Sequence, residues 1–489
     1  MTTVILRNAD CIYTCDDGNR AYRQGYILVR DRRIVEIGNE PWRGQHADIS
    51  LDLTGCVVIP GLVNTHHHFF QSIARGIPAT QRAFAIDWLA GLYPLWAELD
   101  PEALYWASMA ATAELLLTGA TTTADHSYLM PAEDGDFVVS QVNAAADAGI
   151  RLHLVRGSMP TMEGDLAARL SPVMGKRLRR LQDRDEELIP AIENAIRAHH
   201  DSSRHSMLRI ALGPTGVSYA RPNFMRKIAE IAKSGDCGLH THYLPRQLER
   251  TLSRQLTGKE PLAVLAESGW LRPGTWFAHC TELNDDEIRA FAANGCGVAH
   301  CPRTIVRLGY RVPRIAAMQQ EGIRVGIGVD GASSNDSGSM LNEVRLGLLL
   351  HRVNTPDDSD PLMEWMTPYQ ALLMATRNGA AILGRDDIGY LAPEMSADIV
   401  AFSLRDVSYV GASCDPIAAL LMCGSESRAK LTMVNGRVVV ENGKLVSFDE
   451  EHVVSEAGAA ERRLLSAAER HTGINFSHPA GEGPRVHMI

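Results

Sequence analysis

The sequence predicts an α/β protein: a (β/α)8 TIM-like barrel carrying a small β-sandwich that is built from both ends of the chain. Two observations lead to this fold class. Between about residues 60 and 390, helical periodicity alternates with short apolar runs, which is the pattern of a parallel sheet covered by helices. Before and after that stretch, the chain turns into closely spaced short strands separated by turn residues.

The barrel is predicted because the apolar runs number eight, and eight parallel strands close such a barrel. Helix-period segments separate the runs, and the first run follows the turn at Pro60-Gly61. The eight expected strands are Leu62–His68, Ala120–Ala124, Arg151–Arg156, Leu208–Leu212, Gly238–His242, Thr275–His279, Gly297–His300 and Arg324–Asp330.

The two flanking regions are expected to form the sandwich together, because the first is too short to enclose much of a core alone. The turn Asn435-Gly436 predicts a hairpin in the second region. We therefore divide the chain into residues 1–59 (first part of the sandwich), 60–390 (barrel), 391–448 (second part of the sandwich) and 449–489. The last part is predicted to be an amphipathic helix followed by a Gly/Pro-rich tail.

Composition excludes several classes of protein. Of 489 residues, 45% are hydrophobic and 22% charged, as in ordinary globular proteins. The net charge of −10 argues against nucleic acid as a partner, since phosphates need a basic face. Nine scattered cysteines without a Cys-x-x-Cys pair argue against a disulfide framework or a zinc finger and suit a reducing compartment.

No basic and then apolar leader opens the chain, and no window reaches about 18 uninterrupted apolar residues. We therefore expect a cytoplasmic protein with no membrane partner. Residues Leu166–Leu188 contain six basic side chains, and five of them are Lys176, Arg177, Arg179, Arg180 and Arg184. We interpret this segment as a solvated loop and helix that forms a lid over the barrel, in preference to a nucleic-acid patch.

Histidines and one aspartate recur at the carboxyl ends of the predicted barrel strands, where the active face of a parallel barrel lies. One such histidine is more often structural than functional, but six strands ending this way are hard to explain by packing. The residues are His66, His68, His126, His240, His242, His279, His300 and Asp330.

A metal site explains this cluster. If Leu62–His68 is a strand, His66 and His68 share one face and His67 points the other way. Imidazoles with one carboxylate suit Zn²⁺ or Fe²⁺ with an open position for water, and such an ion lowers the pKa of water to roughly 7. We expect His66, His68, His242 and Asp330 to line the site. His240 shares a face with His242, so alternation leaves open which of the two is the ligand.

Competing motifs find little support. Gly326-Ile327-Gly328-Val329-Asp330-Gly331 matches a dinucleotide fingerprint, but a polar segment follows it where a helix is required. The sequence lacks His-Glu-x-x-His, Gly-x-Ser-x-Gly and the Pro-Cys-x-x-Cys of cytidine-type deaminases. The sequence therefore has no motif that would indicate a metalloprotease, a serine hydrolase or a cytidine deaminase.

The residues resemble the amidohydrolase superfamily, and more narrowly its triazine hydrolase and 8-oxoguanine deaminase branch. The resemblance extends over nearly the whole chain. It is specific for the superfamily and not for the substrate. The stretches that carry it are Pro60–Gln71, Leu239-His240-Thr241-His242, Ala278-His279-Cys280, Gly328–Asp336 and Val434–Val439.

The resemblance implies one divalent metal ion per chain, zinc with iron as the alternative, bound by His66, His68, His242 and Asp330. It implies that Asp330 also accepts the proton of the attacking water and that His279 polarises this water. It further implies a small heterocyclic substrate and a homodimer. The positions that line the heterocycle pocket in relatives are Gln71, Trp88 and Tyr128.

Two departures from the family pattern bear on the reaction. Relatives have a proton-shuttling Glu three residues after the histidine that corresponds to His242, but that position here is Pro245, which cannot transfer a proton. Glu249, about one helical turn later, is the candidate replacement. Arg303 follows Cys301-Pro302 where relatives have a different sequence, and it pairs either with an anionic substrate or with a surface carboxylate.

The leading hypothesis is a metal-dependent hydrolase that attacks a C–N bond of a purine-, pyrimidine- or triazine-like heterocycle. The alternative keeps the same water attack but removes chloride or a thioether, or opens a cyclic amide. The missing Glu favours this alternative, since a good leaving group needs less protonation. A non-catalytic binding relative is the third hypothesis, and the full set of five metal-site residues argues against it.

Overall fold

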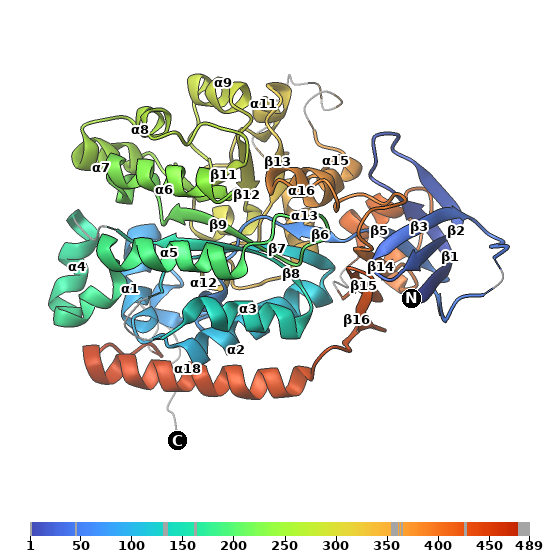
Figure 1. Cartoon of the computed structure of the whole chain (residues 1–489), viewed down its shortest axis with the longest axis horizontal. Helices are drawn as coiled ribbons and strands as arrows, with labels where there is room; N and C mark the ends of the chain where they lie inside the picture. The colour runs from blue at the N-terminus through green and yellow to red at the C-terminus, as the bar shows by residue number, and fades with distance from the viewer. Residues whose placement is uncertain are drawn as a thin grey trace.

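The computed structural model describes residues 2–44, 46–130, 135–160, 164–353, 360, 362, 365–424 and 428–477. Its centre is a closed parallel barrel in the order β10-β11-β12-β13-β6-β7-β8-β9, which confirms the predicted (β/α)8 architecture (Figure 1). The strands are β6 (Leu62–Asn64), β7 (Ala120–Ser127), β8 (Arg151–Ser158), β9 (Leu208–Pro214), β10 (Gly238–Tyr243), β11 (Thr275–His279), β12 (Gly297–His300) and β13 (Val325–Ile327).

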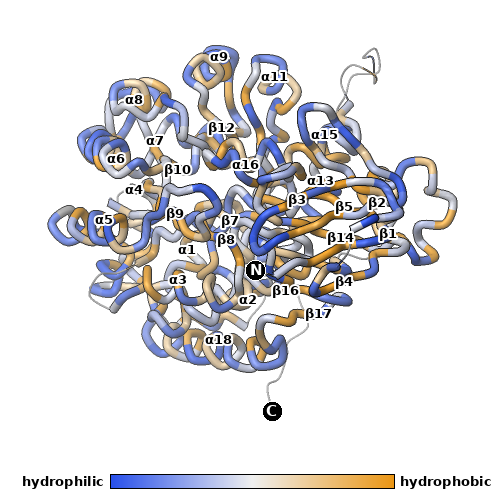
Figure 2. The backbone as a smooth tube through the Cα atoms, turned by 45° about the vertical axis from the view of Figure 1, so that its right-hand side comes forward, coloured by the Kyte–Doolittle hydropathy of each residue, from blue (hydrophilic) through white to orange (hydrophobic). Residues whose placement is uncertain are grey.

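Helices surround the barrel, and their apolar sides pack on its strands. In Figure 2 the exposed sides of these helices are hydrophilic and the strands inside are hydrophobic. The longer helices are α1 (Ala85–Trp96), α2 (Pro101–Leu117), α3 (Phe137–Ala148), α4 (Gly164–Met174), α5 (Asp185–His199), α6 (Pro222–Ser234), α7 (Leu248–Thr257), α9 (Asp285–Ala293), α13 (Met340–Leu350) and α18 (Glu450–Thr472).

Shorter helices complete the connections between these elements. The α-helical ones are α8 (Pro261–Glu267), α10 (Pro302–Arg307), α11 (Ile315–Gln320), α12 (Ala332–Asn335), α15 (Pro368–Leu373), α16 (Gly379–Ile382) and α17 (Pro416–Ala418). Short segments of 3-10 or π geometry are η1 (Phe69–Ile73), η2 (Pro78–Thr80), η4 (Gly175–Leu181), η5 (Val217–Tyr219), η6 (Met374–Asn378), η7 (Val407–Tyr409) and η8 (Ala419–Cys423).

Strands from both ends of the chain come together beside the barrel, as predicted, and they form one sheet. It contains nine strands in the order β17-β16-β15-β14-β5-β1-β2-β3, with β4 paired to β1 outside this path. The strands are β1 (Thr3–Tyr13), β2 (Ala21–Arg30), β3 (Arg33–Asn39), β4 (Ile49–Asp52), β5 (Cys56–Pro60), β14 (Ile399–Ser403), β15 (Leu431–Val434), β16 (Arg437–Glu441) and β17 (Lys444–Leu445).

The sheet branches at β1. Residues Val4–Arg7 pair with β4, whereas Cys11 and Ile12 pair with β5, and the pairing of β1 with β2 shifts between Leu6 and Ala9. Such an irregularity bends a strand and lets its two halves take different partners. Strand β5 then runs directly into β6, so the sheet delivers the chain to the first strand of the barrel.

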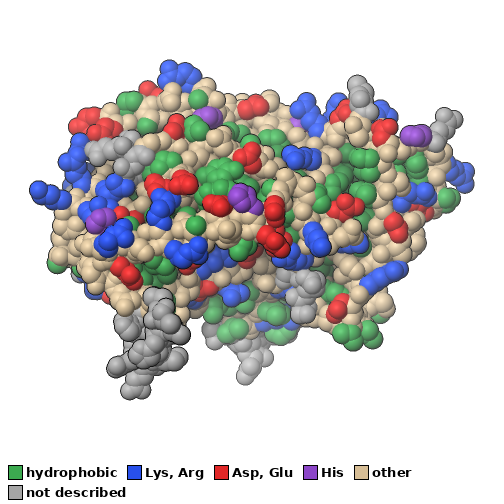
Figure 3. All heavy atoms as spheres, turned by 90° about the horizontal axis from the view of Figure 1, so that it is seen from below, with side chains coloured by type: hydrophobic (Ala, Val, Ile, Leu, Met, Phe, Trp, Pro, Cys, Tyr) green, Lys and Arg blue, Asp and Glu red, His purple; other side chains and the backbone are tan. Residues whose placement is uncertain are grey.

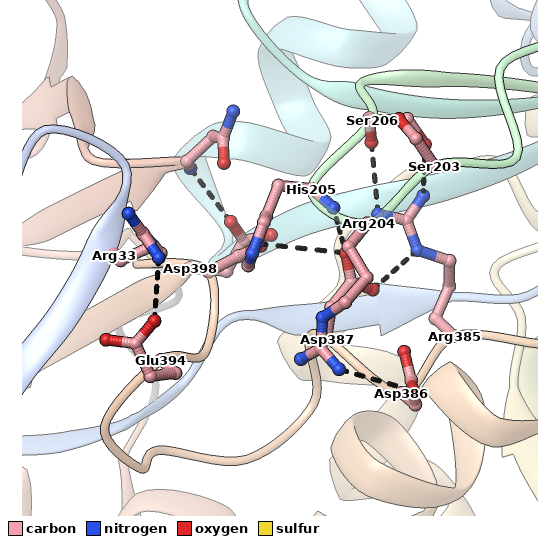
Figure 4. Close-up of polar contacts among 12 residues, drawn as sticks. Arg33, Ser203, Arg204, His205, Ser206, Arg385, Asp386, Asp387, Glu394 and Asp398 are labelled. Carbon is pink, nitrogen blue, oxygen red and sulfur yellow. Dashed lines mark hydrogen bonds and ion pairs between the residues drawn. The ribbon is translucent and has the colours of Figure 1, made fainter.

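A buried polar network joins the sheet region to the barrel (Figure 4). Arg151 at the start of β8 donates to Asp398, with Nη2 and Oδ1 2.9 Å apart and both side chains inaccessible to solvent. Asp398 also accepts from the backbone amide of Asn435 at 2.8 Å. Nearby, Arg385 donates to Asp387 through two hydrogen bonds of 2.8 Å. Removal of one member would leave a buried charge without its partner.

The basic segment that the sequence predicts to be a lid covers α1. Arg177 donates to Glu98, and Nε of Arg180 donates to the carbonyl of Ala97 at 2.7 Å. Arg169 of α4 forms an ion pair with Asp87 of α1 at 2.5 Å. Three of these basic side chains thus have partners within the protein, and this agrees with an intramolecular role for the segment.

The surface mixes charges of both signs. On the face drawn in Figure 3, acidic and basic side chains alternate among apolar ones. All nine cysteines are free thiols. Among the described residues, no helix combines the length and the apolar character needed to cross a bilayer. The predicted C-terminal helix is α18, and the Gly/Pro-rich tail from residue 478 lies outside the described residues.

Candidate metal centre and catalytic cavity

His66 and His68 converge on one point, but the reason differs from the one expected. Strand β6 ends at Asn64, so both histidines lie in the irregular segment after it, and strand alternation does not orient them. Backbone hydrogen bonds fix the segment instead: the Asp330 amide donates to the His66 carbonyl at 3.0 Å. His67 is turned away, with its ring 5.0 Å from that of Phe69.

Hydrogen bonds determine which nitrogen of His66 is available. His240 Nδ1 lies 2.9 Å from the Trp276 carbonyl, which can only accept, so His240 carries its proton on Nδ1. The Nε2 of His240 therefore accepts from Nδ1 of His66 at 2.8 Å. This leaves a lone pair on Nε2 of His66, which has no hydrogen-bond partner among the described residues. His240 thus orients His66 and does not itself face the cluster with a free nitrogen.

The same argument applies to the other two histidines. Nδ1 of His68 donates to the His126 carbonyl at 2.6 Å, and Nδ1 of His242 donates to the Thr215 carbonyl. Both rings then present an Nε2 lone pair, and these two nitrogens lie 3.0 Å apart. Carbonyl acceptors behind ligand histidines are a common way to fix the tautomer at metal sites.

Asp330 brings a carboxylate to the three lone pairs. Its Oδ1 lies 3.2 Å from Nε2 of His66 and 3.3 Å from Nε2 of His68. A carboxylate oxygen and unprotonated nitrogens at this distance repel each other unless a cation lies among them. The described chain has two candidate metal groups, His66, His68, His126 and His242, and His66, His242, His279 and Asp330, and the ligand atoms of each group lie within 4.8 Å of one another. The predicted ligands His66, His68, His242 and Asp330 all occur in these two overlapping groups. These residues therefore fit a divalent metal ion.

The electrostatics of the cluster favour neutral imidazoles. Burial lowers the pKa of His68 to about 3 and that of His279 to about 4, and it lowers the pKa of His66 and His242 as well. These rings are therefore unprotonated near neutral pH, so their lone pairs remain available to a metal ion. Burial alone would raise the pKa of Asp330, but a hydrogen bond from His66 and the charges of His66, His279 and His68, when these rings are protonated, lower that pKa well below the usual value.

The backbone at the two catalytic candidates is unusual. Asp330 has φ +60° and His279 has φ +73°, and residues other than glycine rarely adopt such positive values. Strain of this kind costs on the order of 1–3 kcal/mol and concentrates at functional sites. Hydrogen bonds compensate at Asp330: its Oδ1 accepts from the Gly331 amide at 2.7 Å and its Oδ2 from Oγ of Ser334 at 3.1 Å.

His279 lies beside the cluster. Its ring stacks on that of His242 with 5.3 Å between centroids and 8° between planes. Its Nδ1 is buried without a hydrogen-bond partner among the described residues. His279 also lines the adjoining cavity, so this ring can meet a substrate or a water molecule at the edge of the cluster.

A cavity that is partly open to solvent adjoins the metal-site residues. His68, His242, His279 and Asp330 line one side of it. A concave and largely apolar site with a few polar groups is typical of a small-molecule pocket. The rest of its wall is rich in aromatic side chains, which suit a planar heterocycle. These side chains are Trp88, Tyr93, Tyr128, Tyr219 and Tyr310.

Three of the four predicted substrate residues lie in this wall. Gln71 is buried in η1, and Nε1 of Trp88 donates to the Ser333 carbonyl at 3.2 Å. The Tyr128 ring lies 5.2 Å from that of His68, edge to face. Arg303 is not among the lining residues: its side chain is exposed and its Nε donates to the Asn335 carbonyl at 2.9 Å.

The strand-end histidines do not all belong to the site. His300 lies outside the cavity lining, and its Nε2 is 3.0 Å from Nε2 of His351, the residue after α13. His126 adds its backbone carbonyl to the cluster and a ring next to that of His242. Six strand ends first indicated the site. One of them, the end of β12, thus has a histidine that lies outside the site.

Sequence reasoning did not single out several residues of the cavity. Tyr219, Tyr310 and Arg246 all line it. Tyr219 closes η5 just after β9, so a polar aromatic residue following a barrel strand was the available indication. Arg246 is placed by the loop after β10, and its guanidinium lies 4.9 Å from the centre of the Phe84 ring.

The fold and the site together define a metal-dependent hydrolase built on a (β/α)8 barrel. The chain belongs to the amidohydrolase family, which residues 57–439 match. This assignment confirms the predicted superfamily.

The curated relatives and solved structures agree with it. The chain is 36% identical over 469 residues to 8-oxoguanine deaminase from Pseudomonas aeruginosa, covering 95% of this chain and 100% of that protein. It is 31% identical to hydroxydechloroatrazine ethylaminohydrolase from Pseudomonas sp. strain ADP, covering 97% and 99%. The zinc complex of atrazine chlorohydrolase from Arthrobacter aurescens superposes with a TM-score of 0.86 at 31% identity, covering 94% and 100%.

Proposed function

We propose that this enzyme hydrolyses the bond between a ring carbon of a nitrogen heterocycle and an exocyclic amino or alkylamino group. One observation supports the proposal most directly: three Nε2 lone pairs and the Asp330 carboxylate converge beside an aromatic cavity. The similarity to 8-oxoguanine deaminase and to hydroxydechloroatrazine ethylaminohydrolase supports an aminated purine, pyrimidine or triazine as the substrate class.

In this proposal His66, His68, His242 and Asp330 bind one divalent ion per chain, zinc with iron as the alternative. Such an ion acts as a Lewis acid and makes water nucleophilic near neutral pH. The nitrogen-rich ligand set and the zinc-bound structural relatives support zinc. The nine free thiols support a cytoplasmic location. We also propose that the protein is a homodimer, which sedimentation analysis would test.

The chain's own residues divide the remaining tasks. Asp330 accepts a proton from the attacking water, because its carboxylate faces the cluster and its low pKa keeps it ionised. His279 donates a hydrogen bond to the water and to the oxygen that develops negative charge. Trp88 and Tyr128 pack on the heterocycle, and Gln71 meets its polar edge.

The test is a substrate panel. Purified protein loaded with zinc is incubated with aminated, chlorinated and thiomethylated purines, pyrimidines and triazines, and the release of ammonia or amine, chloride or thiol is measured. We expect amine release and about one zinc per chain. Exclusive release of chloride or thiol would favour the alternative hydrolysis, for which Pro245 in the cavity wall gives a physical reason because it cannot donate a proton.

A further inference from the structure

Glu249 is a carboxylic acid in the wall of the catalytic cavity and is not one of the metal-site residues. It lies in the first turn of α7 and lines the cavity together with Tyr219, Tyr310 and Arg246. Its carboxylate has only neutral hydroxyl groups as described hydrogen-bond neighbours: Ser218, and Tyr219 with its oxygen 3.4 Å from Oε1. The carboxylate borders the cavity, so a ligand bound there can reach it.

Glu249 differs from the other acidic residues around α7. Glu260 forms an ion pair with Arg254, and Glu287 with Arg250 at 2.7 Å. No ion pair is found for Glu249 in the described part of the chain. Burial therefore raises the pKa of Glu249, which increases the fraction that carries a proton. A carboxyl group kept in an active-site wall without a cation is a candidate for acid–base chemistry.

The backbone around Glu249 is fixed with respect to the metal-site residues. The Ser218 hydroxyl donates to the Glu249 carbonyl at 2.9 Å, and the Thr281 hydroxyl donates to the Pro245 carbonyl at 2.7 Å. Thr281 follows His279 closely in sequence, and Pro245 follows His242. The loop that positions Glu249 is thus tied to the same strand ends that position the catalytic histidines.

We propose that Glu249 is the acid that protonates the leaving nitrogen. This inference rests on the proposed function and names the group that completes its reaction. A water oxygen forms a bond to the ring carbon, and Asp330 takes one proton from that water. The C–N bond then breaks as Glu249 gives its proton to the departing nitrogen, which leaves as a neutral amine. The Glu249 carboxylate regains a proton through solvent from Asp330, so the enzyme returns to its starting state and water is the only co-reactant.

The experiment varies the leaving group on a heterocycle that the wild-type enzyme accepts. The substituents are alkylamines and anilines of graded basicity, and kcat is measured for the zinc-loaded wild type and for Glu249→Gln. A more basic amine depends more on protonation to depart. We expect Glu249→Gln to lower kcat about 10²–10⁴-fold for alkylamines and less than about tenfold for the least basic anilines.

Glu260→Gln is the matched control, because it removes a carboxylate from the neighbouring surface and not from the cavity. We expect its rates to follow those of the wild type across the series. The zinc content and melting temperature of each variant are measured beside the rates. Glu249→Gln should melt at or above the wild-type temperature, because it removes an acid that burial disfavours. Glu249→Met, of similar volume and also without an acid, provides a second test if the Gln variant is unstable.

The outcomes separate cleanly. An equal loss of kcat for every leaving group would assign Glu249 to substrate binding or to structure and overturn the proposal. Unchanged kcat for the alkylamines would overturn it as well. If the zinc-loaded wild type releases no amine from any substrate in the panel, the proposed function itself fails, and the role of Glu249 fails with it. Only a loss of kcat that grows with the basicity of the amine supports Glu249 as the acid that protonates the leaving nitrogen.

Discussion

Nδ1 of His66 and Nε2 of His240 are joined by a 2.8 Å hydrogen bond, and His240 in turn donates from Nδ1 to the Trp276 carbonyl. This chain of donors determines which nitrogen of His66 faces the cluster. His240 and His242, which lie two residues apart on β10, therefore have different roles. His242 presents its own lone pair to the cluster, whereas His240 acts on it through His66.

The first prediction concerns this relay. His240→Phe keeps an aromatic ring on β10 but removes the acceptor for Nδ1 of His66. His66 then loses the bond that fixes its tautomer and orientation, and we expect zinc affinity to fall about 10–100-fold. Competition with a chromogenic chelator measures the change. His300→Phe, another buried strand-end histidine that lies outside the cavity, is the control and should bind zinc as tightly as the wild type.

The second prediction concerns Asp330. Asp330→Asn preserves the shape of the side chain and its contact with Ser334 but removes the group that accepts a proton. We expect kcat to fall at least about 10²–10⁴-fold, while the melting temperature stays close to that of the wild type. Asp336→Asn, six residues later and paired with Arg307, is the comparison variant. Near-normal turnover by Asp330→Asn would show that another group accepts the proton.

The barrel was predictable because each of its strands is a short apolar run and each connection has helical periodicity. All eight predicted strands exist, and the strands from the two chain ends lie in one sheet. Local structure was less predictable. The alternation of side chains that predicted a common direction for His66 and His68 required a strand that continues to residue 68. Strand β6 has three residues and ends at Asn64. Backbone hydrogen bonds to the segment around Asp330, far away in sequence, orient the histidines instead.

Charged residues in the cavity were harder to identify for a related reason. Arg303 and Arg246 both follow barrel strands, and no periodicity distinguishes them. The structure directs Arg303 toward the Asn335 carbonyl and leaves Arg246 in the cavity wall, because the two loops leave their strands in different directions. Glu249 lines the cavity because α7 begins at Leu248, and a helix start shifted by one or two residues would turn this carboxylate elsewhere.

The third prediction is a pH dependence of stability in the metal-free protein. Burial lowers the pKa of His67 to about 3 from the usual 6.5, so the folded state holds this ring neutral. Below pH 6.5 the unfolded chain gains a proton that the folded chain does not bind, and stability falls as the pH decreases toward the folded pKa. At pH 5 the cost for His67 is on the order of 2 kcal/mol. His67→Phe should therefore lose less stability between pH 7 and pH 5 in urea unfolding, and identical slopes for the two proteins would contradict this origin.

The fourth prediction concerns the ion pair between Arg151 and Asp398, which joins β8 to the start of β14. Both side chains are inaccessible to solvent, and Asp398 also accepts from the Asn435 amide. Arg151→Met leaves a buried carboxylate without its cation, and we expect a loss of about 3–5 kcal/mol in the free energy of unfolding.

The control for this pair lies on the surface. Arg254→Met breaks an exposed ion pair with Glu260 and should cost no more than about 1 kcal/mol. The double variant Arg151→Met with Asp398→Leu should lose less stability than Arg151→Met alone, because no unpaired charge remains buried. Denaturant unfolding followed by circular dichroism measures all three. A double variant that is less stable than the single one would show that the pair stabilises the junction through its charges, and not only by avoiding an isolated carboxylate.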